Sequence, residues 1–179
     1  MNKDIERILF SEEELKNAVK KIGEEITKDY AGKKPLLVAI LKGSIVFMAD
    51  LMREIDLNCD IDFMVAKSYG SAAVSSGNVK IIKDLDTDIT GRDLIIVEDI
   101  LDSARTLYSV RNYLMQKNPS SIKICTLLDK KVARAFDLKA DYKCFDIENE
   151  FVVGYGLDYA ENYRSLPYVG VLKHEVYEK

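Results

Sequence analysis

Apolar residues recur along the chain in two patterns, one typical of amphipathic helices and one of buried strands. The first helical pattern follows an S-x-x-E capping box at residues 11–14 and stops near Gly32, a residue that commonly ends helices. Its apolar positions, spaced as one face of a helix requires, are Leu15, Val19, Ile22 and Ile26. The chain is therefore expected to open on a long amphipathic helix.

Several later runs are apolar throughout, which predicts strands that are covered on both faces. The predicted strands are LLVAIL from Leu36, Ile61–Lys67, VKIIKDL from Val79, LIIVED from Leu94, IKICTLLD from Ile122 and YVGVL from Tyr168. Two further helices are predicted, one capped by Ser44 with Phe47, Leu51 and Ile55 on its apolar face, the other with Leu107, Val110, Leu114 and Met115 and ended by Pro119. This alternation predicts an α/β fold, with a mostly parallel sheet of four or five strands flanked by helices.

The 179 residues suit one domain, and two full domains would be cramped. The net charge of −4 argues against a nucleic-acid partner, since such proteins usually carry a basic surface. No apolar run approaches the ~18 residues of a membrane span, and the charged N-terminus lacks the apolar core of a signal peptide. Three scattered cysteines and a single histidine indicate reduced thiols without a zinc site. We expect a cytoplasmic protein that binds neither membranes nor nucleic acid.

Polar or small residues directly follow four of the apolar runs, and the carboxyl ends of parallel strands converge on one crevice. The most informative end carries the adjacent acids Glu98 and Asp99. Two neighbouring carboxylates repel each other unless a cation or ligand hydroxyls lie between them, and such oxygens suit Mg²⁺. The alternative is a solvated acidic strand end.

The segment Asp102–Thr106 opens a predicted helix with hydroxyls and consecutive N–H groups. These groups, with the positive end of the helix, favour a phosphate-binding loop. A plain helix cap made by Asp102 or Ser103 is the alternative. The small, polar stretch of residues 68–78 is either a surface loop or a lid over a ligand site.

The segment VEDILDSART, residues 97–106, resembles the phosphoribosyl pyrophosphate (PRPP) motif of type I phosphoribosyltransferases. The segments LKGS, SYG, LLDK and FVVGYGLDYAENYRSLP match further landmarks of the hypoxanthine-guanine branch of that family, in order. The resemblance covers nearly the whole chain. It implies a Mg²⁺-dependent transfer of ribose 5-phosphate from PRPP to hypoxanthine or guanine, with release of pyrophosphate. It also implies a homodimer or homotetramer, a lid around residues 67–79 and a small hood built from the terminal segments.

The resemblance further implies a role for each matching residue. Binding of PRPP and its phosphate falls to Glu98, Asp99, Asp102, Ser103, Ala104, Arg105 and Thr106, with Asp102 also the proton acceptor for the purine. Pyrophosphate binding falls to Lys42, Gly43 and Arg164, and the tip of the lid to Ser68 and Tyr69. The purine is expected at Lys130, Phe151, Val152 and Asp158, and the metal at Glu98, Asp99 and Asp158. The Leu41–Lys42 peptide is expected to be cis in at least some states.

One position departs from the family pattern. Ala104 stands where the family commonly has glycine, and Arg105 follows it in place of a small or apolar residue. A left-handed backbone costs a residue with a Cβ about 1–2 kcal/mol, so we predict a right-handed or bridge conformation at Ala104.

Two alternative functions remain open at this stage. The first is a phosphoribosyltransferase that prefers another base, such as xanthine. The second is a transcription regulator of the same fold that binds nucleotide or PRPP without turnover. The acidic pI of about 5.2 and the presence of Asp102, Lys130, Asp158 and Arg164 weigh against a regulator.

Overall fold

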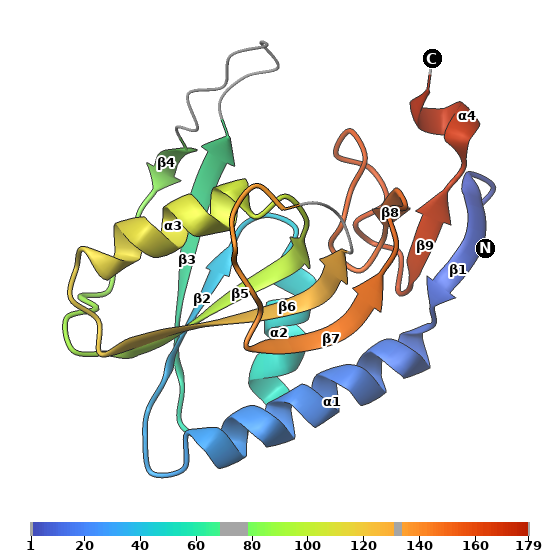
Figure 1. The fold of residues 1–179 in the computed structure, drawn as a ribbon. Coiled ribbons are helices and arrows are strands. Elements are labelled where there is room, and N and C mark those ends of the chain that lie inside the picture. The colour runs from blue at the N-terminus through green and yellow to red at the C-terminus, as the bar shows by residue number, and fades with distance from the viewer. Residues whose placement is uncertain (1, 69–78, 131–133, 179) are drawn as a thin grey trace.

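The computed structural model describes residues 2–68, 79–130 and 134–178, which form two sheets and four helices (Figure 1). The strands are β1 (Ile5–Phe10), β2 (Leu36–Ile40), β3 (Asp60–Ser68), β4 (Val79–Lys83), β5 (Asp93–Leu101), β6 (Ser121–Lys130), β7 (Tyr142–Ile147), β8 (Val152–Val153) and β9 (Val169–Leu172). The helices are α1 (Glu12–Asp29), α2 (Ile45–Glu54), α3 (Arg105–Met115) and α4 (His174–Tyr177). No helix of this described part is long and apolar enough to cross a membrane.

The larger sheet has six strands in the order β4-β3-β2-β5-β6-β7. Every neighbouring pair is parallel except β3 and β4, so the prediction of a mostly parallel α/β sheet is confirmed. The expected four or five strands were too few. Strand β7 was not predicted, because its sequence YKCFDI mixes charged and apolar residues, as an edge strand can.

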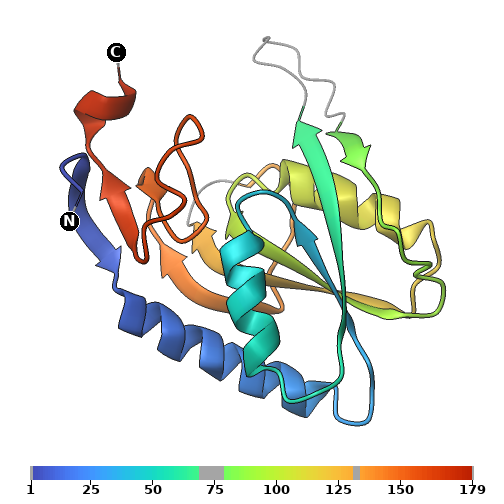
Figure 2. The same cartoon turned by 180° about the vertical axis from the view of Figure 1, so that it is seen from behind.

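Helices cover both faces of this sheet (Figures 1 and 2). Helices α1 and α2 pack on one face, in a cluster that includes Leu37, Ala39 and Val97. Helix α3 packs on the other face, against Val38, Ile96 and their neighbours. Because successive side chains of a strand point to opposite faces, strands β2 and β5 supply both cores and must be apolar at every position.

The second sheet has three strands in the order β1-β9-β8, and both pairs are antiparallel. It joins the two ends of the chain, which lie side by side next to the carboxyl ends of the main sheet (Figures 1 and 2). Strand β1 was not predicted, since the sequence IERILF carries two adjacent charged residues and pairs with residues more than 150 positions away. A separate small core of Ile5, Val153 and Leu172 lies within this sheet.

The helix ends test the local predictions. The capping box of Ser11 and Glu14 is present in both directions. Ser44 does not cap α2 through its side chain, which instead donates a hydrogen bond to the carbonyl oxygen of Ile40 at 2.6 Å. Met115 was placed on the apolar face of α3 but is 45% exposed.

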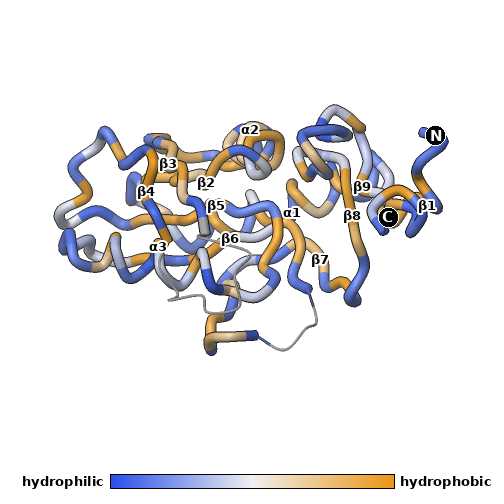
Figure 3. The backbone as a smooth tube through the Cα atoms, turned by 90° about the horizontal axis from the view of Figure 1, so that it is seen from above, coloured by the Kyte–Doolittle hydropathy of each residue, from blue (hydrophilic) through white to orange (hydrophobic). Residues whose placement is uncertain are grey.

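Viewed from above and coloured by hydropathy, the strands of the main sheet and α2 carry prominent hydrophobic stretches (Figure 3).

Candidate active site

The order of the strands creates a crevice between β2 and β5. The chain leaves β2 through α2 on one face, whereas it leaves β5 through α3 on the opposite face. The two connections therefore diverge at the carboxyl ends of adjacent strands, which is where open α/β sheets bind their ligands.

A cavity of about 290 Å³ occupies this crevice. It gathers most of the predicted site residues from four parts of the chain. Its lining includes Lys42, Gly43, Glu98, Asp99, Asp102, Ser103, Ala104, Arg105, Thr106, Asp158 and Arg164. The loop after β2, the end of β5, the start of α3 and the segment after β8 thus share one cavity.

The two adjacent acids on β5, Glu98 and Asp99, line this cavity. Burial raises the pKa of Glu98 well above its ordinary value, and the charge of Asp99 raises it further. Burial also raises the pKa of Asp99 to about 6, and Asp158 adds repulsion that Arg164 opposes. Gly43 lies against Asp99, because an added Cβ would lie 1.6 Å from Oδ2 of Asp99 and would displace that carboxylate. Such crowded carboxylates favour a bound cation or hydroxyl groups.

The start of α3 differs from the sequence-based prediction. Ala104 is the N-cap residue and adopts a left-handed conformation with φ 65° and ψ 0°, so the predicted right-handed or bridge conformation is wrong. Neither Asp102 nor Ser103 is the N-cap. The chain keeps the backbone that glycine would favour, and the methyl group of Ala104 is buried in the core beneath α3. A left-handed residue followed by a helix turns consecutive N–H groups toward the cavity, as an anion site requires.

Asp102, which lines the cavity, forms an ion pair with Lys130, which stands outside the lining that the described residues form. Their Oδ2 and Nζ atoms are 3.6 Å apart, with the Lys130 side chain 13% exposed and that of Asp102 half exposed. Lys130 ends β6, where the preceding Asp129 is buried and pairs with Arg134 and Lys143. The carboxylate of Asp102 therefore points toward a lysine that is largely shielded from water.

The predicted pyrophosphate residues lie on the opposite side of the cavity. The Leu41–Lys42 peptide is cis, as expected. Arg164 donates from Nη1 to the carbonyl oxygen of Gly156 at 2.8 Å, and its Nη2 lies 2.9 Å from Oδ1 of Asp158. Its Nε is buried and has no hydrogen-bond partner among the described residues. An unpaired buried donor costs about 1–3 kcal/mol, so this nitrogen favours an incoming acceptor.

Glu161 was not singled out from the sequence, yet it connects the two expected pyrophosphate cations. Its Oε2 lies 3.1 Å from Nζ of Lys42 and 3.3 Å from Nη2 of Arg164. The hydrogen bonds from Lys42 and Arg164 lower the pKa of Glu161. An anionic group thus already occupies the space between these cations. The sequence signal that could have found Glu161 is its position three residues before Arg164.

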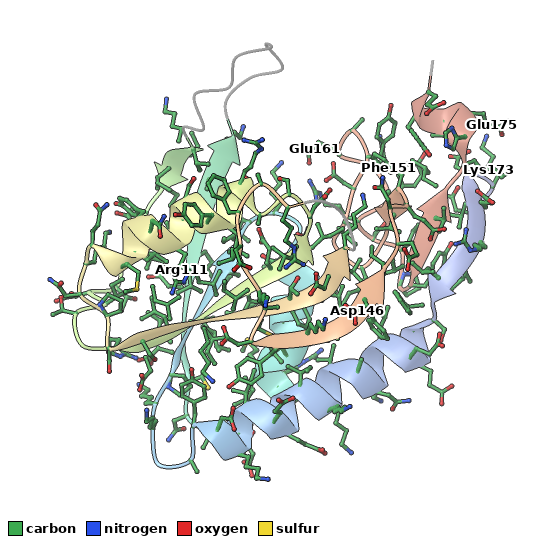
Figure 4. All side chains as sticks on the ribbon, in the orientation of Figure 1. Arg111, Asp146, Phe151, Glu161, Lys173 and Glu175 are labelled. Atoms are coloured by element: carbon green, nitrogen blue, oxygen red, sulfur yellow. The ribbon has the colours of Figure 1, made fainter. Side chains whose placement is uncertain are left out.

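Of the predicted purine residues, Val152 begins β8 of the small sheet and Phe151 directly precedes it. Both stand outside the lining of the cavity, as far as the described residues define it. Val152 is buried in β8 and pairs with Val171. Phe151 is 38% exposed and lies beside the loop that carries Glu161 (Figure 4). Its ring stacks on Tyr177 at 4.7 Å and meets Tyr159 edge-on at 5.5 Å.

The expected lid follows β3. Ser68 ends β3, and Tyr69, with most of the expected lid, falls outside the described residues.

Among the described residues, no group of three or more His, Cys, Asp or Glu side chains is arranged to hold a metal ion. A cation in the crevice would thus rely on one or two carboxylates and on oxygen atoms of the substrate, which is the usual environment of Mg²⁺ beside phosphates.

Comparison with known proteins agrees with this geometry. Residues 8–160 match the family described as the phosphoribosyl transferase domain. The chain is 55% identical over 179 residues to the hypoxanthine-guanine phosphoribosyltransferases of Streptococcus thermophilus and Streptococcus pyogenes, covering 100% of this chain and 99% of each relative.

Solved structures are also similar. A hypoxanthine phosphoribosyltransferase from Staphylococcus aureus superposes with a TM-score of 0.95 at 48% identity, covering 98% of this chain and 96% of the other. A mutant of the Trypanosoma cruzi enzyme, in a ternary complex with substrates, gives a TM-score of 0.93 at 38% identity, covering 98% and 100% of the two chains.

Proposed function

The chain belongs to the phosphoribosyl transferase family, and we propose that it is a purine-salvage enzyme that makes IMP or GMP from PRPP and hypoxanthine or guanine. The relatives carry enzyme names over their full length, and this supports catalysis rather than the regulator alternative. The single observation that carries the proposal is the cavity at the β2–β5 crevice, which gathers acids, cations and a phosphate-type loop.

The reaction breaks the bond between the ribose C1 carbon and pyrophosphate and forms a bond from C1 to a purine nitrogen. Positive charge builds on the ribose while negative charge builds on pyrophosphate. Catalysis of such a step needs position and charge stabilisation rather than a covalent nucleophile. We assign pyrophosphate to the side of the cavity formed by Lys42, Gly43 and Arg164. The free Nε of Arg164 supports this assignment.

We assign the 5-phosphate to residues 103–106, with the ribose hydroxyls at Glu98 and Asp99. The first N–H groups of a helix lack helical partners and are available to phosphate oxygens. The left-handed backbone of Ala104 supports this role, because it directs the N–H groups on either side of it to a common point. Arg105 and the hydroxyl of Thr106 add a cation and a donor at the same loop.

We assign the purine to the space between the crevice and the small sheet. In this arrangement Asp102 accepts the proton that leaves the imidazole ring, and Lys130 donates to the 6-oxo group. The ion pair of Asp102 with Lys130 supports the assignment, since the two groups would flank the same base. A positioned general base typically contributes about 10² to 10⁴ in rate. Phe151 would stack on the ring through its exposed face, while the backbone of Val152 borders the edge of the base.

We propose Mg²⁺ as the cofactor. One or two of the carboxylates of Glu98, Asp99 and Asp158 would hold each ion together with substrate oxygens, and the raised pKa of both β5 acids supports a cationic partner. When bound, the ion would neutralise the charge of the pyrophosphate.

We further propose one domain over residues 1–179, in which β1, β8 and β9 form the hood and residues 67–79 form a lid. We propose that the protein works in the cytoplasm. The three cysteines, all free in the described structure, are consistent with that compartment.

We also propose a homodimer or homotetramer. The outer face of α2 exposes Ile45 and Met52, each 41% exposed, and the neighbouring β3 exposes Ile61 at 42%. Strand alternation places Ile61 on the same side as Phe63, which packs in the α1–α2 cluster. Adjacent exposed apolar side chains of this kind mark an association surface.

The direct test offers PRPP and Mg²⁺ with hypoxanthine, guanine, xanthine, adenine or uracil in separate assays, and measures pyrophosphate release. We expect turnover with hypoxanthine and guanine. A marked preference for xanthine would replace the proposed substrates. Binding of PRPP without turnover of any base would favour the regulator.

A further inference from the structure

We infer that Tyr155 is a positioning residue for pyrophosphate, acting through a hydrogen bond to Asp50 that ties the Arg164 segment to α2. The inference rests on the proposed function, because it assumes that pyrophosphate binds beside Lys42, Gly43 and Arg164. The starting observation is that the Tyr155 hydroxyl donates to Oδ2 of Asp50, while Oδ1 of the same carboxylate pairs with Arg53.

The backbone around Tyr155 is unusual. Gly154, Tyr155 and Gly156 have consecutive positive φ angles of 99°, 51° and 102°. Glycine adopts such angles freely, whereas a tyrosine does so only where other contacts hold it. The N–H groups of Tyr155 and Gly156 donate to the carbonyl oxygens of Leu166 and Arg164 at 2.9 and 3.0 Å. The position of Tyr155 thus fixes the backbone that carries Arg164.

The same turn touches the loop after β2. A Cβ on Gly156 would lie 2.1 Å from the carbonyl oxygen of Gly43, so the two backbones are in direct contact. The carbonyl oxygen of Gly156 also accepts the hydrogen bond from Nη1 of Arg164. Gly156 therefore contacts both the loop of Lys42 and Gly43 and the side chain of Arg164. A shift of this turn would move both.

Asp50 supplies a fixed anchor for the turn. It lies in the second turn of α2, the helix that begins directly after the Lys42–Gly43 loop and packs on the sheet through Phe47 and Leu51. Burial raises the pKa of Tyr155, and the hydrogen bond to Asp50 raises it further. The phenol therefore stays protonated and remains a donor.

The ring of Tyr155 is buried in the α1–α2 cluster, but packing does not enclose it on every side. A cavity of about 630 Å³ lies beside it, lined by Tyr155, Asp50 and Arg53 together with Arg164 and residues of α1. A ring that borders a cavity can move toward it when its hydrogen bond is lost. The polar contact therefore acts together with this packing in setting the position of the turn relative to α2.

The test substitutes Tyr155→Phe, which removes the hydroxyl and keeps the ring. The matched control is Tyr142→Phe, another buried tyrosine, whose hydroxyl donates to Asp29 at 2.7 Å far from the crevice. We measure equilibrium binding of PRPP with Mg²⁺, inhibition by pyrophosphate, the KM of the base and the melting temperature. Losing a hydrogen bond to a charged group shifts an equilibrium by roughly a factor of ten. The turn in Tyr155→Phe should therefore occupy its binding position about a tenth as often, and PRPP and pyrophosphate binding should weaken ~10-fold. The KM of the base and the control variant should change less than about 2-fold.

Variants at Asp50 provide a second test from the other side of the bond. Asp50→Asn retains an acceptor oxygen for the Tyr155 hydroxyl and should preserve most of the binding, whereas Asp50→Ala should match Tyr155→Phe. Adding Tyr155→Phe to Asp50→Ala should cause little further loss, because both remove the same contact.

Several outcomes would overturn the inference. One is unchanged PRPP and pyrophosphate binding in Tyr155→Phe, whatever its melting temperature. Another is an equal loss for PRPP and the base, or an equal loss in Tyr142→Phe, which would show a merely structural contribution. Because PRPP binding is measured at equilibrium, a wild-type protein that binds PRPP without turning over any base would refute the proposed function and still decide the role of Tyr155.

Discussion

Gly43 and Asp99 approach each other so closely that a Cβ on Gly43 would lie 1.6 Å from Oδ2 of the Asp99 carboxylate. The glycine follows β2 and the acid lies near the carboxyl end of β5, so this contact joins the two sides of the crevice. The proposed pyrophosphate and ribose sites thus depend on the absence of a single side chain.

Gly43→Ala tests this relationship. The added methyl group must displace either Asp99 or the loop of Lys42, and misplacement by about 1 Å can cost ~10²-fold in rate. We expect kcat/KM for PRPP to fall about that much. Gly32→Ala is a control for a destabilised fold, because an added Cβ there meets nothing within 4 Å but the φ of 76° strains an alanine. This variant should lose stability and keep its activity. Activity of Gly43→Ala close to wild type would show that the contact is not needed.

Ala104 allows a prediction about stability. Glycine at this position would relieve about 1–2 kcal/mol of left-handed strain, but it would lose about 0.8 kcal/mol of methyl burial and 0.4–1 kcal/mol through a more flexible unfolded chain. These terms nearly cancel, so Ala104→Gly should change the free energy of unfolding by less than about 1 kcal/mol. Ala104→Val should cost more than about 2 kcal/mol, since a β-branched residue resists this conformation. Urea unfolding measures both, and a well-tolerated valine would contradict the left-handed geometry.

Asp62 carries a pH-dependent part of the stability. Its buried carboxylate accepts the backbone N–H groups of Phe63, Asp86 and Thr87 at 2.7–3.0 Å. Burial alone would raise the pKa of Asp62, but the hydrogen bonds from Thr87 and Phe63 hold it below its ordinary value. A lowered pKa means that the stabilisation is present at neutral pH and is lost as the pH falls below about 4.

Asp62→Ala should therefore reduce the free energy of unfolding by about 3 kcal/mol at pH 7, because it leaves buried donors unpaired. The difference from wild type should shrink as the pH falls from 4 toward 3. Denaturant unfolding at several pH values measures it, with the exposed Asp86→Ala as a control that should show little pH dependence. A difference that stays constant with pH would exclude the ionised carboxylate as its source.

The apolar face of α2 predicts an effect on assembly. Met52→Glu places a charge in the proposed contact and should shift the molecular mass measured by light scattering from oligomer toward monomer. Met115→Glu is the matched control, because Met115 is equally exposed at 45% but lies on α3, on the opposite face of the sheet. A monomeric wild type, or an equal effect of both variants, would contradict the proposed interface.

Much of the fold could be predicted from local sequence, and the exceptions have physical causes. The capping box at Ser11 and the apolar strands β2, β5 and β6 follow from patterns within a few residues. Strand β1 depends on pairing with β9 at the other end of the chain, which no local pattern records. Strand β7 is charged at Lys143 and Asp146 and looks like a loop until it pairs with β6.

The candidate site shows a similar division. The ends of β2 and β5 could be placed because both strands are apolar and their polar ends must meet at one edge. The backbone at Ala104 was predicted wrongly, because local strain was weighed without the core that surrounds the methyl group. Glu161 was missed because it acts through contacts with Lys42 and Arg164, one of which lies more than 100 residues away.

Asp102→Asn tests the account most directly, since it changes one atom at the proposed proton acceptor. The amide keeps the shape of the side chain and the contact with Lys130 remains possible, so PRPP binding with Mg²⁺ should stay within about 3-fold of wild type. The variant cannot act as a base, so kcat with hypoxanthine should fall by about 10² to 10⁴. Turnover is measured as pyrophosphate release and PRPP binding by calorimetry. A fall in kcat with binding retained is the predicted result, and a kcat close to wild type would contradict catalysis by this site.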